Sequence, residues 1–287
     1  MRNILRRIIP YQFKRIYHYY FKNNIFYHKY PVFVNSIPKC GTNLLLNIFK
    51  AIPNTMYIKD LSYAMDVNDG EGRLKYLQKK ISTFLPGSFY TGHVPHTIEI
   101  AAWFKQKKFK HIWIYRDPRD YAVSHYNFFL NDATTAYHKE WLNMKNNSER
   151  LMASIIGTGK GKMEYYFGEY DCKKDLFRFE CIANVCIIYS HFERWLSDEN
   201  VLPIRYENLI DKEKSLTEII RILNFLGFKN ENEKVTAQKI MESGFDPSKS
   251  HTFRLGRSGA WKEEFTQAHL DAFNSIGGAE VLKKFNY

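Results

Sequence analysis

A short turn between an apolar run and a helix-like segment carries the residues with the clearest chemical potential. Lys39, Gly41 and Thr42 follow the apolar residues 32–34. A helix start leaves backbone N–H groups unpaired and carries partial positive charge, so it binds phosphate-like oxygens, and a glycine lets the backbone approach them. The lysine precedes the glycine, whereas a Walker A loop requires G-x-x-x-x-G-K-[ST]. The sequence therefore predicts an anion-binding turn over residues 39–43, called the anion cradle below. It disfavours an ordinary ATP- or GTP-binding P-loop.

The segment 111–124 repeats this pattern of an apolar run followed by a helix start. Asp117 suits the N-cap of a helix and Pro118 its first turn. Arg116 would then lie at the strand end, and Ser124 about two turns along the helix, roughly 9 Å further at the usual rise per residue. This pair can grip one phosphate from two sides. Two anion sites in one chain indicate a ligand with two anionic ends.

A third segment, residues 253–262, combines three cations with two glycines and predicts a loop that can wrap a phosphate. Four motifs together resemble the sulfotransferases that use 3′-phosphoadenosine 5′-phosphosulfate (PAPS). The motifs are P-K-C-G-T at 38–42, the run from Arg116 to Ser124, R-Y-E-N-L at 205–209 and F-R-L-G-R-S-G-A-W-K at 253–262. The joint occurrence of the four is far more specific than any single motif.

The resemblance implies a PAPS site assembled from these motifs. The turn 39–43 would hold the 5′-phosphosulfate, Arg116 and Ser124 the 3′-phosphate, and Tyr206 would lie against adenine. Residues 254–256 would also clasp the 3′-phosphate. By residue, the implied cosubstrate-binding set is Lys39, Cys40, Gly41, Thr42, Asn43, Arg116, Ser124, Tyr206, Arg254, Leu255 and Gly256. The chain departs from the family pattern at Leu44, Leu255 and Ala260, where many members have tryptophan, lysine and aspartate.

The resemblance also implies a catalytic histidine, since H-V-P at 93–95 matches the family's H-L-P context after the strand-like run 88–92, with His93 as the histidine. A histidine near its usual pKa can take a proton from an attacking hydroxyl at neutral pH. Thr91 occupies a position where cytosolic members have a lysine, so Lys39 would carry more of the charge stabilisation. His96 is the alternative base.

The implied reaction is in-line transfer of a sulfuryl group to an acceptor hydroxyl of a saccharide, a glycolipid or another small alcohol or phenol. By analogy with phosphoryl transfer, positioning and electrostatics would supply most of the catalysis. Lys39 would neutralise the leaving oxygen and His93 would deprotonate the acceptor. No His/Cys or carboxylate set has ligand spacing, so we expect no metal.

Each of these features also has a plainer structural interpretation. A turn such as 38–42 is usually only a turn, and Arg116 alone would be taken for a surface cation. His93 can be a packed histidine, Ser124 can bond back to its own helix, and Tyr206 can be a core aromatic at a strand end. The combination of motifs, not any one residue, favours the catalytic interpretation.

Two rival functions belong to other classes. A P-loop nucleotide kinase would need the G-K-[ST] that the chain lacks. A non-enzymatic basic module for nucleic acid or acidic polymer would spread cations over a groove. The positive charge is instead concentrated near the N-terminus, so we expect no nucleic-acid partner.

The fold class follows from the alternation of strand-like and helix-like segments. Apolar runs at 32–35, 88–92, 112–115 and 201–205 alternate with helical patterns, which predicts an α/β fold: a parallel sheet flanked by helices. Together with the resemblance, this implies the P-loop-nucleoside-triphosphate-hydrolase-like sulfotransferase fold with a helical cap. Apolar residues at helical spacing from Leu216 to Leu226 predict a helix that ends at Gly227.

Domain organisation is predicted from length and composition. The 287 residues, 45% of them hydrophobic, suit one domain over 31–287 preceded by an arm over 1–30. The segment 131–180 is polar and rich in aromatic residues and shows no clear periodicity, and we expect it to form a cap over the acceptor site.

Positive charge is concentrated at the start of the chain. Residues 1–59 hold ten Lys/Arg and no Asp/Glu, so they carry +10 of the net +12. The arm 1–30 is basic, aromatic and amphipathic, a pattern typical of helices that lie on anionic lipid surfaces. The alternative is that the arm folds onto the domain.

The remaining patterns indicate a cytoplasmic protein, with association at the inner membrane face as the alternative location. Charges interrupt every window long enough to span a bilayer, and the arm lacks an apolar signal-peptide region. The spacing of Cys40, Cys172, Cys181 and Cys186 fits neither a zinc site nor a disulfide framework.

Cys40 lies in the anion cradle, where nearby cations can lower the pKa of a thiol and make it reactive. The preferred interpretation is that Cys40 is only a small residue that fits the turn. The oligomeric state is not predicted.

Overall fold

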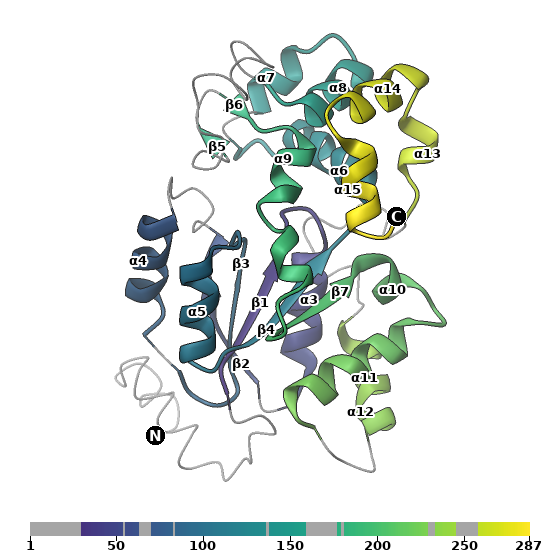
Figure 1. The fold of residues 1–287 in the computed structure, drawn as a ribbon. Helices are drawn as coiled ribbons and strands as arrows, with labels where there is room; N and C mark the ends of the chain where they lie inside the picture. The colour runs from purple at the N-terminus through teal and green to yellow at the C-terminus, as the bar shows by residue number, and fades with distance from the viewer. Residues whose placement is uncertain are drawn as a thin grey trace, which may run out of the picture.

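The computed structural model describes residues 30–53, 55–62, 70–82, 84–135, 138–158, 177–178, 181–228, 233–244 and 258–287. Its centre is a five-stranded sheet in the order β2-β3-β1-β4-β7, in which every neighbouring pair is parallel (Figure 1). The strands are β1 (Val32–Ser36), β2 (Met56–Asp60), β3 (Ser88–Gly92), β4 (Lys110–Tyr115) and β7 (Val201–Arg205). The predicted parallel sheet is therefore confirmed.

Strand β2 is the one member of this sheet that the sequence does not predict. Strand β2 lies at the edge of the sheet, where its first four residues are partly buried and its last residue, Asp60, is exposed. Its pairing with β3 shifts register between Tyr57 and Lys59. An irregular edge strand lacks the continuous apolar run that marks the buried strands.

Helices cover both faces of the sheet. One face packs against α3 (Thr42–Ala51), α10 (Tyr206–Ile210), α11 (Ser215–Leu226) and α12 (Glu233–Gly244). The other packs against α4 (Gly70–Lys80), α5 (Ile98–Gln106) and the short 3₁₀ helix η3 (Glu193–Leu196). Strand β1 contributes side chains to the hydrophobic cores on both faces of the sheet, because Val32 and Val34 point to the first face and Phe33 to the second. As predicted, α11 ends at Gly227, which adopts a left-handed conformation.

A helical layer lies beyond the carboxyl ends of the strands (Figure 1). It contains α6 (Pro118–Asn131), α7 (His138–Asn143), α8 (Asn147–Ile156), α9 (Val185–Ser190), α13 (Trp261–Glu264), α14 (Gln267–Ser275) and α15 (Gly278–Lys284). A short antiparallel pair, β5 (Phe177–Arg178) and β6 (Cys181–Ile182), lies beside it. Of the predicted cap over 131–180, the structure describes chiefly α7 and α8.

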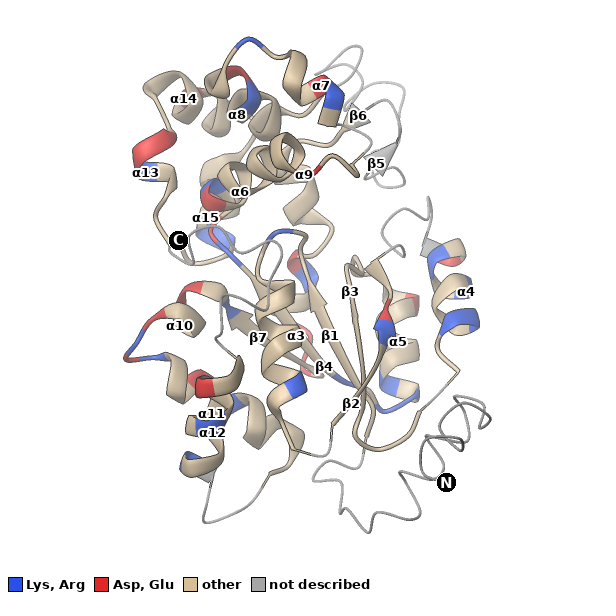
Figure 2. Cartoon of the chain, turned by 180° about the vertical axis from the view of Figure 1, so that it is seen from behind, with Lys and Arg blue, Asp and Glu red and all other residues tan. Residues whose placement is uncertain are grey.

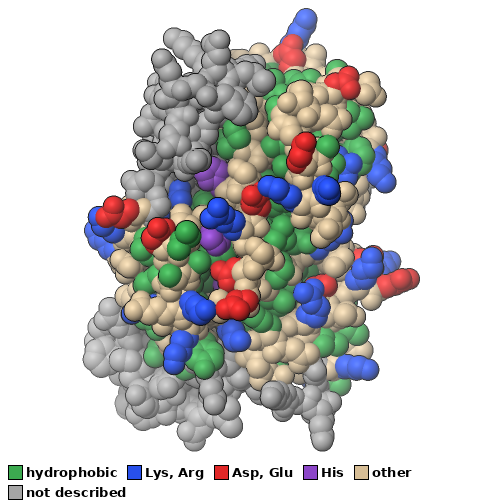
Figure 3. All heavy atoms as spheres, viewed as in Figure 1, with side chains coloured by type: hydrophobic (Ala, Val, Ile, Leu, Met, Phe, Trp, Pro, Cys, Tyr) green, Lys and Arg blue, Asp and Glu red, His purple; other side chains and the backbone are tan. Residues whose placement is uncertain are grey.

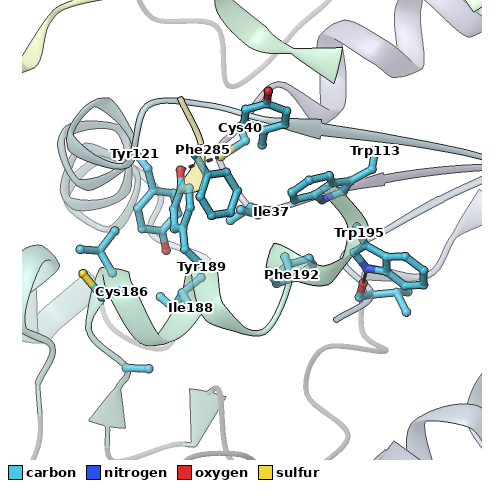
Figure 4. Close-up of a cluster of buried hydrophobic side chains, with 14 of the residues drawn as sticks. Ile37, Cys40, Trp113, Tyr121, Cys186, Ile188, Tyr189, Phe192, Trp195 and Phe285 are labelled. Atoms are coloured by element: carbon cyan, nitrogen blue, oxygen red, sulfur yellow. Dashed lines mark hydrogen bonds between the residues drawn. The ribbon is translucent and has the colours of Figure 1, made fainter. Parts of the chain in front are cut away.

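The helical layer shares its hydrophobic core with the sheet. The buried cluster that contains Phe33 of β1 also contains Tyr121 of α6, Tyr189 of α9 and Phe285, which follows α15. In Figure 4, Phe285 lies between the rings of Tyr189 and Trp113, so the end of the chain packs against both layers. The position of the layer over the sheet is therefore fixed by buried aromatic contacts.

Two predictions from the sequence concern residues near the C-terminus and the N-terminus. The sequence predicts a loop throughout 253–262, but Trp261 and Lys262 begin α13. A helix forms here because the N–H groups of Gly259 and Trp261 bind the Asp120 carboxylate and hold this turn against α6. Residues 254–256 and the arm 1–29 lie outside the described residues.

Charged residues lie mainly in the outer helices and loops, and the strands contain few of them (Figure 2). Among the described residues, no helix is long and apolar enough to cross a membrane. Within the same ranges, no three His, Cys, Asp or Glu side chains gather as metal ligands would.

Candidate active site

The carboxyl ends of the strands bring the sequence motifs to one edge of the sheet. Strand pairing aligns Asn35 of β1 with Gly92 of β3 and Tyr115 of β4 with Arg205 of β7. The residues that follow these strands therefore lie at a common edge, below the helical layer. This edge is where ligands bind in open α/β sheets.

The turn after β1 has the backbone geometry of an anion cradle. Lys39 adopts a left-handed conformation with φ 63°, and Gly41, the N-cap of α3, has φ 108°. Among the described residues, no side chain caps this helix start. A Cβ atom on Gly41 would lie 2.7 Å from Cδ2 of Tyr206, so only glycine fits against this ring. A helix that starts at a glycine without a side-chain cap is the kind of helix start at which proteins bind anions, so the predicted cradle stays a proposal for this turn.

His93 is joined to this turn by its Nδ1 atom. That atom lies 3.0 Å from the carbonyl oxygen of Ser36 and 3.0 Å from its Oγ atom, and the Ser36 hydroxyl in turn lies 2.7 Å from the hydroxyl of Thr42. A carbonyl oxygen only accepts, so Nδ1 carries the proton and Nε2 is the basic nitrogen. Burial lowers the pKa of His93, while the bond to Ser36 and the charge of Asp60 raise it. A neutral imidazole with Nε2 as its basic nitrogen is suited to general base catalysis.

The loop that carries His93 is clamped by residues that the sequence motifs do not reveal. The Asn35 side chain both donates to the carbonyl of Val94 (2.8 Å) and accepts from its N–H (2.8 Å). Trp195 Nε1 donates to the same carbonyl at 2.9 Å. A buried asparagine directly after the three apolar residues that begin β1 is the sequence signal that could have found this clamp.

His96 lies in a different environment from His93. The His96 ring packs edge-on against the Trp195 ring, with centroids 4.4 Å apart. The backbone N–H of His96 donates to the carbonyl oxygen of His191. Burial lowers the pKa of His96. The direct link between His93 and the cradle favours His93 over His96 as the base. In Figure 3, histidine side chains reach the surface near the junction of the sheet and the helical layer.

Lys39 points from the cradle towards α6. Its ammonium group lies 3.9 Å from the centroid of the Phe128 ring. Burial lowers the pKa of Lys39 to about 8, while the charge of Asp132 opposes the shift. A partly desolvated ammonium interacts strongly with an anion, because little water screens it.

Cys40 is a structural part of the turn. Its side chain is fully buried, and its Sγ atom lies 3.5 Å from the hydroxyl of Tyr189, as Figure 4 shows. Tyr189 donates in turn to the carbonyl oxygen of Arg116 at 2.8 Å. Burial raises the pKa of Cys40 to about 12, although Tyr189 and Arg116 lower it. The hypothesis of a reactive thiol is therefore wrong for this conformation, because desolvation outweighs the nearby cation.

Arg116 and Tyr206 form a second cationic position at the same edge. Arg116 is buried, and its guanidinium lies 4.6 Å from the centroid of the Tyr206 ring. Although burial by itself lowers the pKa of Arg116, the charge of Asp120 and the neighbouring Tyr206 leave it raised. Ser124 is partly buried and lies in α6, whose N-cap is Asp117 and whose first residue is Pro118, as predicted.

Asp120 ties Arg116 to the second half of the segment 253–262. Its buried carboxylate lies 3.5 Å from the Arg116 guanidinium and accepts from the N–H groups of Gly259 (2.7 Å) and Trp261 (3.0 Å). The sequence motifs do not reveal this role of Asp120. Of the third motif, residues 254–256 lie outside the described residues, so the structure does not place Arg254, Leu255 or Gly256.

A single family model matches almost the whole chain. The sulfotransferase domain model covers residues 29–286. The chain belongs to the sulfotransferase family. This assigns the protein to the enzymes that transfer sulfuryl groups and excludes the nucleotide-kinase alternative.

Curated relatives and solved structures agree with the sulfotransferase assignment. Sulfotransferase 6B1 of Mus musculus is 26% identical over 275 residues, which cover 89% of this chain and 79% of the relative. The 3-alpha-hydroxysteroid sulfotransferase of Cavia porcellus is 27% identical over 208 residues, 65% of this chain and 61% of the relative. Mouse sulfotransferase SULT7A1 complexed with PAP shares the fold, with a TM-score of 0.59 and 19% identity over 90% of this chain and 88% of that chain.

Proposed function

We propose that this sulfotransferase moves the sulfuryl group of PAPS to an acceptor hydroxyl, with His93 as the general base and Lys39 as the principal charge-stabilising residue. The observation that carries the proposal is the bond from His93 Nδ1 to the carbonyl oxygen of Ser36. It fixes the tautomer with Nε2 basic and holds the imidazole beside the turn that would receive the phosphosulfate.

The proposed cosubstrate site fits a ligand with two anionic ends. The start of α3, at which no described side chain acts as a cap, would bind the 5′-phosphosulfate together with Lys39. Gly41 lets this helix start lie directly against the Tyr206 ring. Arg116 and Ser124 would bind the 3′-phosphate, and Tyr206, beside Arg116, would contact adenine. Arg254 and Gly256 remain proposed on the sequence motif alone, as do the backbone contacts of Cys40, Thr42, Asn43 and Leu255.

The proposed reaction is a single in-line displacement at sulfur. The acceptor oxygen attacks the sulfur and forms the new S–O bond while its proton passes to His93 Nε2. The bond between sulfur and the 5′-phosphate oxygen breaks, and that oxygen leaves with the electron pair as part of 3′,5′-adenosine bisphosphate. Lys39 would stabilise the negative charge that develops on this leaving oxygen.

The comparisons support the donor more directly than the acceptor. Two solved structures with this fold, mouse SULT7A1 and retinol dehydratase, are complexes with PAP, and the guinea-pig relative is named for a hydroxysteroid. We propose a small-molecule or glycan hydroxyl as the acceptor.

A cytoplasmic location and membrane-surface association through residues 1–30 stay predictions from the sequence. Sedimentation with anionic liposomes, comparing the full chain with one that starts near Tyr30, tests the second.

A thermal-shift screen tests donor binding first. We expect 3′,5′-adenosine bisphosphate to raise the melting temperature, because it binds only the folded state, and we expect ADP with Mg²⁺ to give little shift. A shift with magnesium–ATP and none with the bisphosphate would contradict the proposal.

Sulfate transfer from PAPS to a panel of hydroxyl acceptors then tests catalysis. We expect His93→Gln to reduce kcat by about 10²-fold or more, the usual contribution of a positioned general base. His96→Gln is the matched control, since His96 lies in the same loop but packs against Trp195, and it should retain activity. Equal losses in both variants would remove the specific role of His93.

A further inference from the structure

The last residue of the chain is bonded to a carboxylate beside the proposed nucleotide site. The hydroxyl of Tyr287 donates to Oε2 of Glu207 at 2.5 Å. The Arg205 guanidinium stacks 3.8 Å from the centroid of the Tyr287 ring and lies 3.5 Å from the same carboxylate. Burial and the neighbouring Glu207 raise the pKa of Tyr287, so its hydroxyl stays protonated and remains a donor at every working pH.

The other oxygen of Glu207 reaches the start of α6. Glu207 Oε1 accepts from the N–H of Asp117 at 3.0 Å. Asp117 follows Arg116 in the chain, and Glu207 follows Tyr206. The two adjacent pairs are therefore joined twice, once by this hydrogen bond and once by the contact of the Arg116 guanidinium with the Tyr206 ring.

We propose that Tyr287 is a positioning residue that acts through Glu207 to hold Arg116 and Tyr206 at their mutual spacing. The inference rests on the proposed function, in which these two residues bind the 3′-phosphate and adenine. Tyr287 itself touches neither Arg116 nor the proposed ligand in this scheme. Its hydroxyl fixes the rotamer of Glu207, and Glu207 fixes the peptide that carries Arg116.

The surroundings of Glu207 make this restraint necessary. Glu207 and Tyr287 line a cavity of about 250 Å³ together with Asp117, Arg119 and Trp261, among other residues. Without the Tyr287 hydroxyl, the carboxylate has space in which to turn away from Asp117. Two of the cations that line the cavity already have carboxylate partners, since Arg119 is paired with Asp117 and Arg205 with Glu207.

The size of the effect follows from the bonds that remain in Tyr287→Phe. A hydrogen bond to a charged group is stronger than one between neutral groups, so its loss should be measurable. Only part of that energy is passed on to ligand binding, since the stacked ring and Arg205 still restrain Glu207 in this variant. We therefore expect nucleotide affinity to fall by a few-fold rather than to disappear.

The test measures binding and steady-state kinetics of the full chain with Tyr287→Phe, which keeps the ring under Arg205 and removes only the hydroxyl. We expect the Kd for 3′,5′-adenosine bisphosphate and the KM for PAPS to rise roughly three- to tenfold. The acceptor KM and kcat at saturating PAPS should stay within about twofold, because the proposed base and cradle are untouched. Tyr76→Phe, in α4 on the other side of the molecule from β7 and α10 (Figure 1), is the matched control and should change none of these constants.

A double-mutant cycle identifies Glu207 as the intermediary. In a Glu207→Ala background, Tyr287→Phe should leave the Kd for the bisphosphate unchanged, because the hydroxyl then has no carboxylate to orient. Equal Kd values for Tyr287→Phe and the unchanged protein would overturn the inference, and so would additive effects in the cycle. If the unchanged protein itself does not bind the bisphosphate, the proposed function fails instead, and the two failures are thereby distinguished.

Discussion

His93 Nδ1 lies 3.0 Å from the carbonyl oxygen of Ser36, the last residue of the strand that leads into the anion cradle. The proposed base and the proposed sulfate-binding turn are thus parts of one hydrogen-bonded unit. Asn35, the preceding residue, clamps the loop that carries the histidine from the same strand. A shift of β1 relative to β3 would displace both the base and the cradle.

Asp60 should tune the acid limb of the pH–activity profile. Its charge raises the pKa of His93, and Thr91 donates to its Oδ1 atom at 2.8 Å. The base works as neutral imidazole, so activity rises with pH through the His93 pKa. Asp60→Asn should shift that limb of kcat/KM to lower pH. An unchanged limb, or a shift to higher pH, would contradict the assignment.

Lys39 should set the alkaline limb of the same profile. Its pKa is lowered to about 8, mainly by burial, so in the free enzyme it loses its charge as pH rises through 8. kcat/KM for PAPS should therefore fall above that pH. Lys39→Arg stays charged throughout and should abolish the alkaline limb, although at a lower maximum because a planar guanidinium does not reproduce a point charge. Persistence of the limb in this variant would show that another group titrates there.

Gly41→Ala should cost both stability and nucleotide binding. A side chain at φ 108° adds about 1–2 kcal/mol of strain, and the new Cβ would lie 2.7 Å from Tyr206. Gly227→Ala is a matched control, because Gly227 has φ 90° but no described atom lies within 4 Å of the place that its new methyl group would take. Both variants should lower the free energy of unfolding in urea, whereas only Gly41→Ala should weaken binding of the bisphosphate.

His111 should make the protein less stable in acid. Burial lowers its pKa to about 3, and neither ring nitrogen has a hydrogen-bond partner within the described part of the chain. Between pH 6.5 and 3 the unfolded chain binds this proton and the folded chain does not, so stability falls by up to about 1.4 kcal/mol per pH unit as pH decreases. His111→Phe, among Phe33, Phe104 and Trp195, should flatten this dependence.

Urea unfolding at about pH 5 and about pH 7.5, on either side of the unfolded-state pKa, measures this effect. The stability difference between the two pH values should be smaller in His111→Phe than in the unchanged protein. Part of the slope should remain, because burial also lowers the pKa of His125 to about 3. Equal differences in the two proteins would show that His111 is not the titrating group.

The sequence alone determined the local units of this protein. An apolar strand, a turn and a helix start follow from backbone physics within a few residues, with a glycine in the turn at 32–43 and an Asp-Pro helix start at 111–124. The helix that ends at Gly227 follows in the same way. The prediction of anion binding depends on these local units alone. The irregular edge strand β2 escaped prediction because half-buried residues leave no clear pattern.

Only the tertiary structure decided how the units act on one another. The His93 tautomer depends on a carbonyl 57 residues away, Asp120 holds a turn 139 residues away, and Glu207 binds a tyrosine 80 residues away. The high pKa of Cys40 likewise comes from burial under the helical layer, not from its neighbours in sequence. Such contacts depend on packing between distant segments, and no local pattern of residue types encodes them.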